Sequence, residues 1–180
     1  MKAVVDFETT GLPGEITQVA IVPFEDHTPF VYYSRPETID RESRAWGITG
    51  IDPDWLLTAL PAQDIVDRLI EWAPAQRLTP VAHNYPFEHS VLTSWLGNVK
   101  DQLFSHYGYC TFQMAALLRE YGIIEPKNLK LGGLCEYFGI ETGKLHDAYY
   151  DCLATKELFE RLIHEYGIST LPAASHGANA

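Results

Sequence analysis

Three segments with the pattern of β-strands follow one another near the start of the chain, and this order limits the folds that it can adopt. They cover residues 3–5, 16–24 and 28–35, and turn-forming or polar residues separate them. Strands so close together favour an antiparallel meander. Further along, helical patterns alternate with two more strand patterns, at residues 78–82 and 107–110. We therefore predict an α/β fold with a central five-stranded mixed sheet flanked by helices.

The helical patterns also have recognisable ends. Gly97, Gly122 and Gly139 each follow an apolar periodic segment and predict helix termini. The predicted helices cover residues 54–60, 61–72, 86–97, 112–121, 129–138 and 148–166. A chain of 180 residues can form one domain with a complete core. We predict that this domain covers residues 1–168 and that residues 169–180 form a flexible C-terminal tail.

Composition restricts what such a domain can bind. The formal net charge is −11, with 13 Lys and Arg against 24 Asp and Glu. A protein that binds long nucleic acids through their phosphates usually carries a basic stripe, so this composition argues against extended and tight non-specific binding. Three widely spaced cysteines fit reduced thiols better than disulfides or a zinc site. With no membrane-length apolar segment or leader pattern, we expect a cytoplasmic protein without membrane partners.

Asp6 and Glu8 end the first strand pattern, directly before a turn-forming cluster. Residues two apart on a strand point to the same face, so both carboxylates should project together. Two like charges at that distance raise each other's pKa unless a cation lies between them. Mg²⁺ and Mn²⁺ prefer such oxygen ligands. The pair therefore indicates either a metal site or two solvated acids at a frayed strand end.

A second candidate site begins just after the fourth strand pattern, at the sheet edge where open α/β sheets bind ligands. Glu88 falls in the first turn of the helix that follows. Taken alone, it could simply favour the helix dipole. We expect His83 and Asn84 to stabilise the connecting loop through hydrogen bonds rather than to catalyse a reaction.

A third candidate site lies where the longest helix begins. His146 precedes the helix, and Asp151 lies in its second turn, from which it can point inward. Asp147 is the natural N-cap residue, so we interpret it as structural. A neutral histidine near an ionised acid can accept a proton near neutral pH.

Together these segments offer four acids and one imidazole at strand ends and helix starts. Two cations held by such acids can stabilise the attacking and leaving oxygens of a phosphodiester hydrolysis. The sequence contains no Walker glycines, no HExxH spacing and no serine elbow.

These residues also resemble a known family, the DEDDh 3′–5′ exonucleases. The resemblance rests on DFETTGL at 6–12, HNYPFE at 83–88 and HDAYYD at 146–151, in the order and at the distances of that family's three motifs. WGITGI at 46–51 is similar to a further family segment. The similarity covers about residues 2–166. It implies an RNase H-like fold, an exonuclease domain, and release of nucleoside 5′-monophosphates from a 3′ end.

The resemblance also implies roles for individual residues. Asp6, Glu8, Glu88 and Asp151 would hold two divalent metal ions, Mg²⁺ or Mn²⁺, and His146 would be the general base. Thr9, Thr10 and Ile48 match positions that contact the terminal nucleotide in relatives. Phe7 should lie in the core.

Glu88 departs from the family pattern, because this motif normally ends in Asp. The longer side chain could bind the second ion directly, change metal preference or weaken catalysis. We expect activity to be retained because the other four residues are present.

The expected partner is the 3′ end of a nucleic acid, with single-stranded DNA favoured. The low positive charge leaves open an oligoribonuclease-like or RNA-processing enzyme that acts on short substrates. A catalytically weakened nucleic-acid-binding module is a further alternative, which the acidic composition disfavours. Aromatic residues such as Tyr32 or Trp55 could serve a homodimer.

Overall fold

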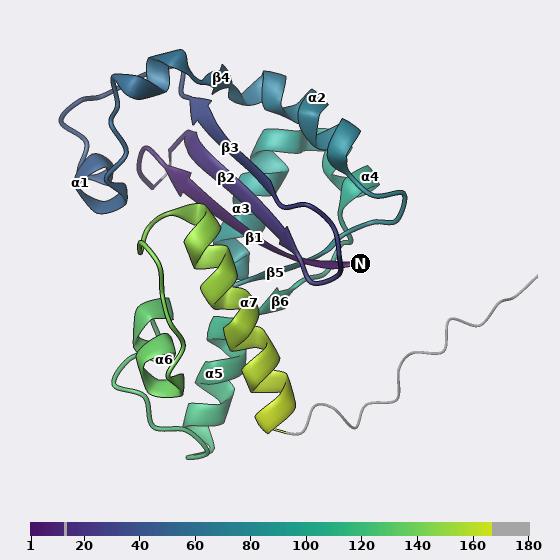
Figure 1. Ribbon diagram of the computed structural model, residues 1–180, viewed down its shortest axis with the longest axis vertical. Coiled ribbons are helices and arrows are strands. Elements are labelled where there is room, and N and C mark those ends of the chain that lie inside the picture. Colours follow the sequence, from purple (N-terminus) through teal and green to yellow (C-terminus); the bar gives the residue numbers. More distant parts are fainter. Residues whose placement is uncertain (13, 167–180) are drawn as a thin grey trace, which may run out of the picture.

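A mixed sheet with helices on both faces forms the centre of the protein, and the computed structural model describes residues 1–12 and 14–166 of the chain (Figure 1). The strand order is β4-β3-β2-β1-β5-β6. The strands are β1 (Lys2–Thr9), β2 (Ile16–Pro23), β3 (Phe30–Arg35), β4 (Leu60–Pro61), β5 (Thr79–Ala82) and β6 (Tyr109–Cys110). The predicted tail at 169–180 lies outside the described residues.

Helical segments connect and cover these strands. The α-helices are α1 (Ala45–Thr49), α2 (Ala62–Trp72), α3 (Tyr85–Leu96), α4 (Lys100–Leu103), α5 (Thr111–Glu120), α6 (Leu131–Phe138) and α7 (Ala148–Glu165). Two 3₁₀ helices, η1 (Trp55–Thr58) and η2 (Gly97–Val99), complete the set in the described part of the chain. None of the helices in that part is long and apolar enough to cross a membrane.

β1 is central because its residues are apolar on both faces. It pairs antiparallel with β2 and parallel with β5, and β2 pairs antiparallel with β3. Ala3, Val4 and Val5 are fully buried, which is typical of a strand covered on both sides. The predicted meander of the first three strands is therefore confirmed.

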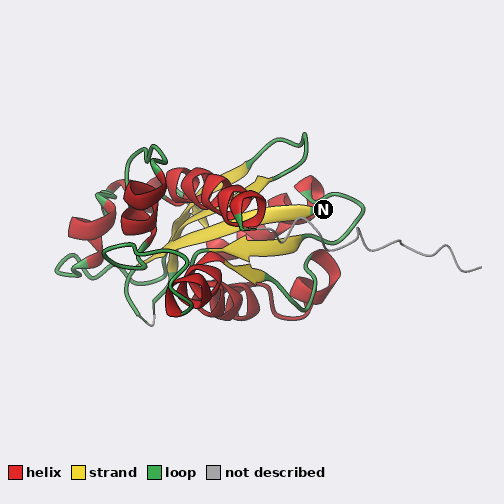
Figure 2. Ribbon diagram, turned by 90° about the horizontal axis from the view of Figure 1, so that it is seen from below, coloured by secondary structure: helices red, strands yellow, loops and turns green. Residues whose placement is uncertain are grey.

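The two faces of the sheet have separate cores, and Figure 2 shows helices on both sides of the strands. On one face, Val5 and Phe7 pack with residues of α2 and α3 such as Leu69 and Leu92. On the other face, a cluster of strand and α7 residues includes Val4, Ala20, Val22, Val81, Cys152 and Phe159. Because side chains alternate along β1, residues 4, 6 and 8 share the face that α7 covers.

A third core lies beyond the sheet, where α5, α6 and α7 pack together. Its buried members include Ala115, Leu134, Ile140 and Leu158. Gly139 ends α6 with a positive φ of 65°, a conformation that a glycine adopts without steric cost. This packing fixes the axis of α7 and therefore the position at which the helix meets the sheet.

Several sequence predictions need correction in detail. The sheet has six strands rather than five, because the two-residue β4 adds a parallel edge beside β3. A segment of that length has no recognisable period. Leu153 fits the apolar periodicity of the helix predicted over 148–166, which would place it in the core, but it is 39% exposed. Thr111 directly precedes the helix predicted over 112–121 and has the side chain of an N-cap residue, but it lies inside α5, and Cys110 occupies the N-cap position.

Candidate active site

Asp6 and Glu8 lie near the carboxyl end of β1, on the face that α7 covers. In the pairing with β2, Asp6 lies opposite Ala20, and Glu8 lies opposite Gln18. Both acids are half-buried, whereas Phe7 between them is 4% exposed and makes an edge-on contact with Trp95 on the opposite face. The alternation predicted for this strand is confirmed, and it directs two carboxylates toward the start of α7.

A hydrogen-bonded link between β2 and α7 holds that helix start in place. Gln18, 1% exposed, donates from Nε2 to the carboxylate of Asp147 at 3.1 Å and accepts from the Ala148 amide at 3.0 Å. Asp147 also caps the helix by accepting from the Tyr149 amide at 3.1 Å. The predicted capping role of Asp147 is thus confirmed, and its carboxylate is satisfied by neighbours.

Asp151, one turn later, meets Glu8 and His146. Ligand atoms of these three side chains lie within 4.8 Å of one another. The His146 amide donates to Asp151 Oδ2 at 3.1 Å. His146 has a positive φ of 59°, which is uncommon for a residue with a side chain, and its ring is exposed. The hydrogen bond and the backbone conformation therefore turn an accessible imidazole toward the carboxylates.

Glu88 approaches from α3, where it lies in the first turn. It is only 4% exposed, and its Oε2 atom has no hydrogen-bond partner among the described residues. Burial and the nearby charge of Glu8 raise the pKa of Glu88 well above its usual value. A buried carboxylate oxygen without a donor is costly, so this atom points to a bound cation.

The pKa values of the other acids are raised in the same way. Burial raises the pKa of Asp6 well above its usual value, and the charges of Glu88, Asp151 and Glu8 add to this effect. Burial, together with the charges of Asp151 and Asp147, raises the pKa of Glu8 to about 7. Burial also raises the pKa of Asp151, although its contact with His146 opposes the shift. The donors are hard carboxylate oxygens that repel one another, and such a set fits a divalent metal ion.

His83 supports the loop that leads to Glu88. Its Nε2 lies 3.0 Å from the Leu129 carbonyl oxygen, and its Nδ1 lies 2.9 Å from the Thr111 hydroxyl. Because a carbonyl only accepts, Nε2 carries the proton in the neutral ring. The predicted loop-stabilising role of His83 is confirmed, and Thr111 serves this contact instead of capping α5.

Thr9 and Thr10 shape the turn after β1. The Thr9 hydroxyl donates to the Gly11 carbonyl at 2.8 Å, and the Thr10 hydroxyl accepts from the Glu15 amide at 3.0 Å. Ser43 ties the segment before α1 to this turn by donating to the Thr10 carbonyl at 2.7 Å. Ile48, on α1, is 56% exposed. The turn that follows Glu8 and the segment that leads into α1 are therefore held together beside the end of β1.

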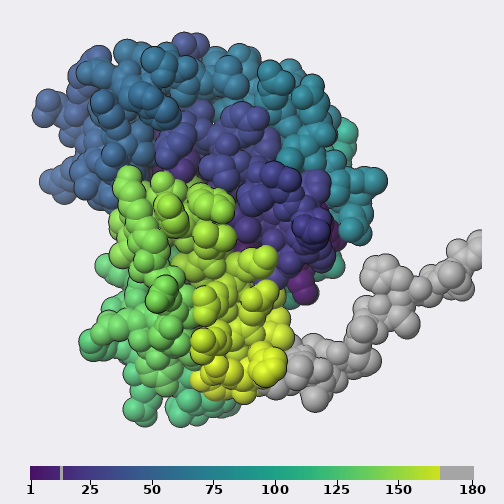
Figure 3. Space-filling view, in the orientation of Figure 1, coloured from purple at the N-terminus to yellow at the C-terminus, as the bar shows by residue number. Residues whose placement is uncertain are grey.

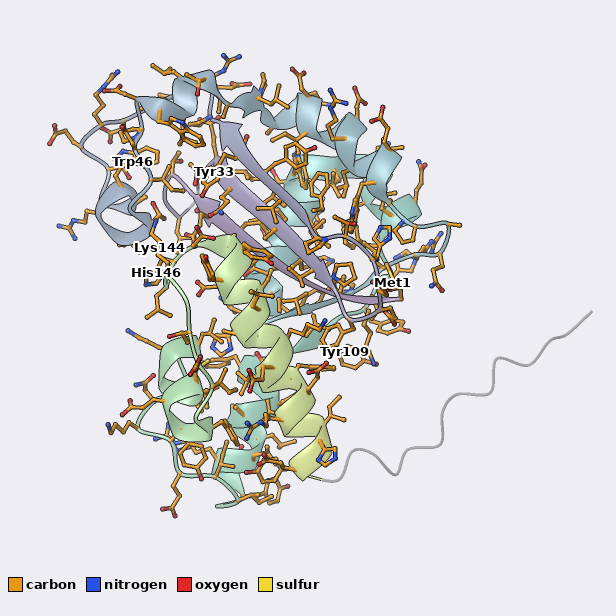
Figure 4. All side chains as sticks on the ribbon, viewed as in Figure 1. Met1, Tyr33, Trp46, Tyr109, Lys144 and His146 are labelled. Carbon is orange, nitrogen blue, oxygen red and sulfur yellow. The ribbon has the colours of Figure 1, made fainter. Side chains whose placement is uncertain are left out.

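The loop between α6 and α7 lies next to the end of α1, because Lys144 in this loop is close to Gly50. Figure 3 shows the α1 segment and this loop on either side of N-terminal residues, and Figure 4 shows Lys144 and His146 together at the start of α7. Lys144 and Gln18 are the two residues here that sequence reasoning missed. Gln18 has a recognisable signal, since it is a polar residue inside an otherwise apolar strand, whereas Lys144 has none.

Comparison with known proteins identifies the class. The family model described as Exonuclease (RNase_T) matches residues 3–159, so the chain belongs to this family of nucleases, which are hydrolases. The chain is 28% identical over 172 residues to a PolC-type DNA polymerase III from Oceanobacillus iheyensis. That match covers 89% of this chain but only 11% of the polymerase.

Solved structures share the fold at low sequence identity. Exonuclease X in complex with 5′-overhanging duplex DNA matches with a TM-score of 0.66 and 21% identity, over 93% of each chain. The nuclease domain of 3′hExo, a DEDDh family member bound to rAMP, matches with a TM-score of 0.63 and 18% identity. The match covers 91% of this chain and 92% of that domain. The predicted RNase H-like α/β fold is confirmed.

Proposed function

We propose that this protein is a metal-dependent 3′–5′ exonuclease of the DEDDh type that releases nucleoside 5′-monophosphates. The observation that carries the proposal is the convergence of carboxylates from β1, α3 and α7, among which Glu88 has a buried oxygen without a donor. Its raised pKa and those of its neighbours give the site a strong preference for cations.

In the proposed mechanism, Asp6, Glu8, Glu88 and Asp151 would hold two divalent ions, Mg²⁺ or Mn²⁺. Bound in this way, the ions would stabilise the attacking and leaving oxygens of an in-line displacement. His146 takes the proton from the attacking water. Because the imidazole is exposed, it can return that proton to solvent after each cycle. The hydrogen bond from the His146 amide to Asp151 keeps the ring beside the carboxylates.

The proposed substrate is the 3′ end of a nucleic acid, with single-stranded DNA favoured. Tyr150-Asp151-Cys152 on α7 is similar to exodeoxyribonuclease X, and the matched structure of that enzyme contains duplex DNA with a 5′ overhang. Thr9 and Thr10 would present the turn after β1 to the terminal nucleotide. Ile48, exposed on α1, would contact its base or sugar.

The net charge of −11 favours one alternative, an oligoribonuclease-like or RNA-processing enzyme that acts on short substrates. A weakened binding module is less consistent with acids that remain converged and unpaired. A panel of labelled single-stranded DNA, duplex DNA, RNA and dinucleotides, each with Mg²⁺ and with Mn²⁺, separates these cases. We expect fastest release of mononucleotides from single-stranded DNA. Measurable binding without any product would contradict the proposed function.

Glu88 gives a second test of the site. Because Glu is longer than Asp, we propose that it reaches the second ion directly. Glu88→Asp should then change the rate with Mg²⁺ relative to the rate with Mn²⁺. An unchanged ratio and unchanged rates would show that the extra methylene has no role.

We also propose that the protein forms a homodimer and is located in the cytoplasm. Trp55 is 48% exposed and lies edge-on to Tyr33, so it is available to a homodimer, whereas Tyr32 packs against the core. Sedimentation of wild type and Trp55→Ser would test the dimer.

All three cysteines are buried and free, which supports the proposed cytoplasmic location. Cell fractionation would test it.

A further inference from the structure

Lys144 is a positive charge at the edge of an otherwise acidic site. It lies in the loop between α6 and α7, two residues before His146, and its side chain is exposed (Figure 4). Its charge opposes the rise in the pKa of Glu8, so its ammonium group lies within electrostatic reach of that carboxylate.

The Lys144 side chain also reaches the end of α1. Lys144 Nζ lies 3.4 Å from the position that a Cβ atom on Gly50 would occupy. Gly50 follows α1 with a positive φ of 67°. Its lack of a side chain leaves room for the ammonium group. Lys144 therefore extends from the loop before α7 to the end of the helix that carries Ile48.

In the part of the chain that the structure describes, the ammonium group of Lys144 has no protein partner. No carboxylate there lies within ion-pair distance of it, and no hydrogen bond engages it. Two other lysines with defined partners give a contrast. Lys127 pairs with Glu136 at 2.7 Å, and Lys156 donates to the Pro23 carbonyl at 2.9 Å. An acidic protein thus leaves an unpaired cation beside its most acidic cluster.

We propose that Lys144 binds a non-bridging phosphate oxygen of the nucleic acid, at the place where the loop before α7 meets the end of α1. This inference rests on the proposed nuclease function and deepens it by naming a substrate contact. An ammonium group cannot ligate a metal ion, and its natural partner near the acids is a bound anion. The contact also explains how a protein of net charge −11 can hold a polyanion: it needs one well-placed cation and metal-neutralised carboxylates, not a basic stripe.

The test compares Lys144→Gln with Lys144→Arg and with Arg77→Gln as the charge-matched control. Arg77 is exposed and contacts the N-terminal amine through its carbonyl, and Met1 lies at the far end of the sheet from Lys144 (Figure 4). Hydrolysis of single-stranded DNA is measured over a range of substrate and salt concentrations. We expect Lys144→Gln to raise KM about tenfold with kcat changed less than about twofold. Its log–log salt slope should fall by about 0.7, the value for one phosphate contact on a single strand.

Lys144→Arg should retain most of the wild-type KM, and Arg77→Gln should change neither KM nor the slope. If Lys144→Gln behaves like Arg77→Gln, or lowers kcat alone, the phosphate contact is wrong. A wild-type protein that cleaves no nucleic acid would instead overturn the proposed function. Equal melting temperatures and circular dichroism spectra of all variants confirm that folding is unchanged.

Discussion

Two acids on the same helix, one turn apart, have opposite surroundings. Asp147 accepts hydrogen bonds from Gln18 and from the Tyr149 amide, so its charge stabilises the start of α7. Asp151 lies beside Glu8 and His146 and has a raised pKa, chiefly because it is buried. Asp147 uses its carboxylate to hold the start of the helix, whereas Asp151 accepts from the His146 amide and faces Glu8, where it is available to a cation.

Removing the metal ions should have the largest effect, and it should affect the site around Asp151 but not the contacts of Asp147. With EDTA, we expect turnover to fall to background, because the proposed chemistry needs the cations. The structure around Asp147 should persist, since its partners are protein groups. Release of labelled mononucleotide, with excess Mg²⁺ or Mn²⁺ restored as the control, measures this. Full activity in EDTA would exclude a metal-dependent reaction.

Asp151→Asn and His146→Ala should each lower kcat at least about a hundredfold. Asn lacks the charge that holds a cation, and Ala lacks a base. Purified variants are compared with wild type by initial rates, with circular dichroism as the folding control. A near-normal rate in either folded variant would remove that residue from the mechanism.

The pH dependence of stability should report the unsatisfied acids. The pKa of Glu8 in the folded protein is about 7, above its ordinary value of 4.5, so the folded state binds more protons between these values. Stability of the metal-free protein should therefore fall as pH rises through this window. Mg²⁺ requires ionised carboxylates and should raise Tm more at pH 8 than at pH 5.5. Thermal melts at both pH values, with and without Mg²⁺, measure this, and an equal increment at both would contradict the assignment.

Asp147→Ala should lower the stability of the folded state. Losing the cap and the link to Gln18 should cost about 1–2 kcal/mol of unfolding free energy. Urea denaturation of Asp147→Ala beside Asp151→Asn measures the contrast, because we expect no comparable loss for Asp151→Asn. Equal destabilisation of both variants would remove the distinction between the two acids.

Glu88→Gln should have the smallest effect, and in the opposite direction. Removing a buried charge without a partner should stabilise the metal-free protein by about 1 kcal/mol at pH 8. Glu160→Gln, at an exposed position on α7, is the matched control and should be neutral. Destabilisation by Glu88→Gln in the absence of metal would show that the carboxylate has a structural partner.

Local patterns account for much of the fold and for most of the site. The two-residue alternation along β1 correctly places Asp6 and Glu8 on one face and Phe7 in the core. Asp147 is the expected cap of the last helix. Short elements and surface orientation were less predictable, as β4 and the exposed Leu153 show. The two-residue β4 is too short to show a periodic pattern. Leu153 can face solvent without interrupting the apolar periodicity of α7.

The sequence by itself determined the meander of the first three strands, the pairing of acids on β1 and the start of α7, because each depends on neighbouring residues. Only the tertiary structure decided which acids are satisfied. Gln18 reaches Asp147 across 129 positions of the chain, and burial leaves Glu88 Oε2 without a donor. Lys144 meets the end of α1 in the same way. Hydrogen bonding and desolvation depend on every group within a few ångströms, and those groups come from segments that only folding brings together.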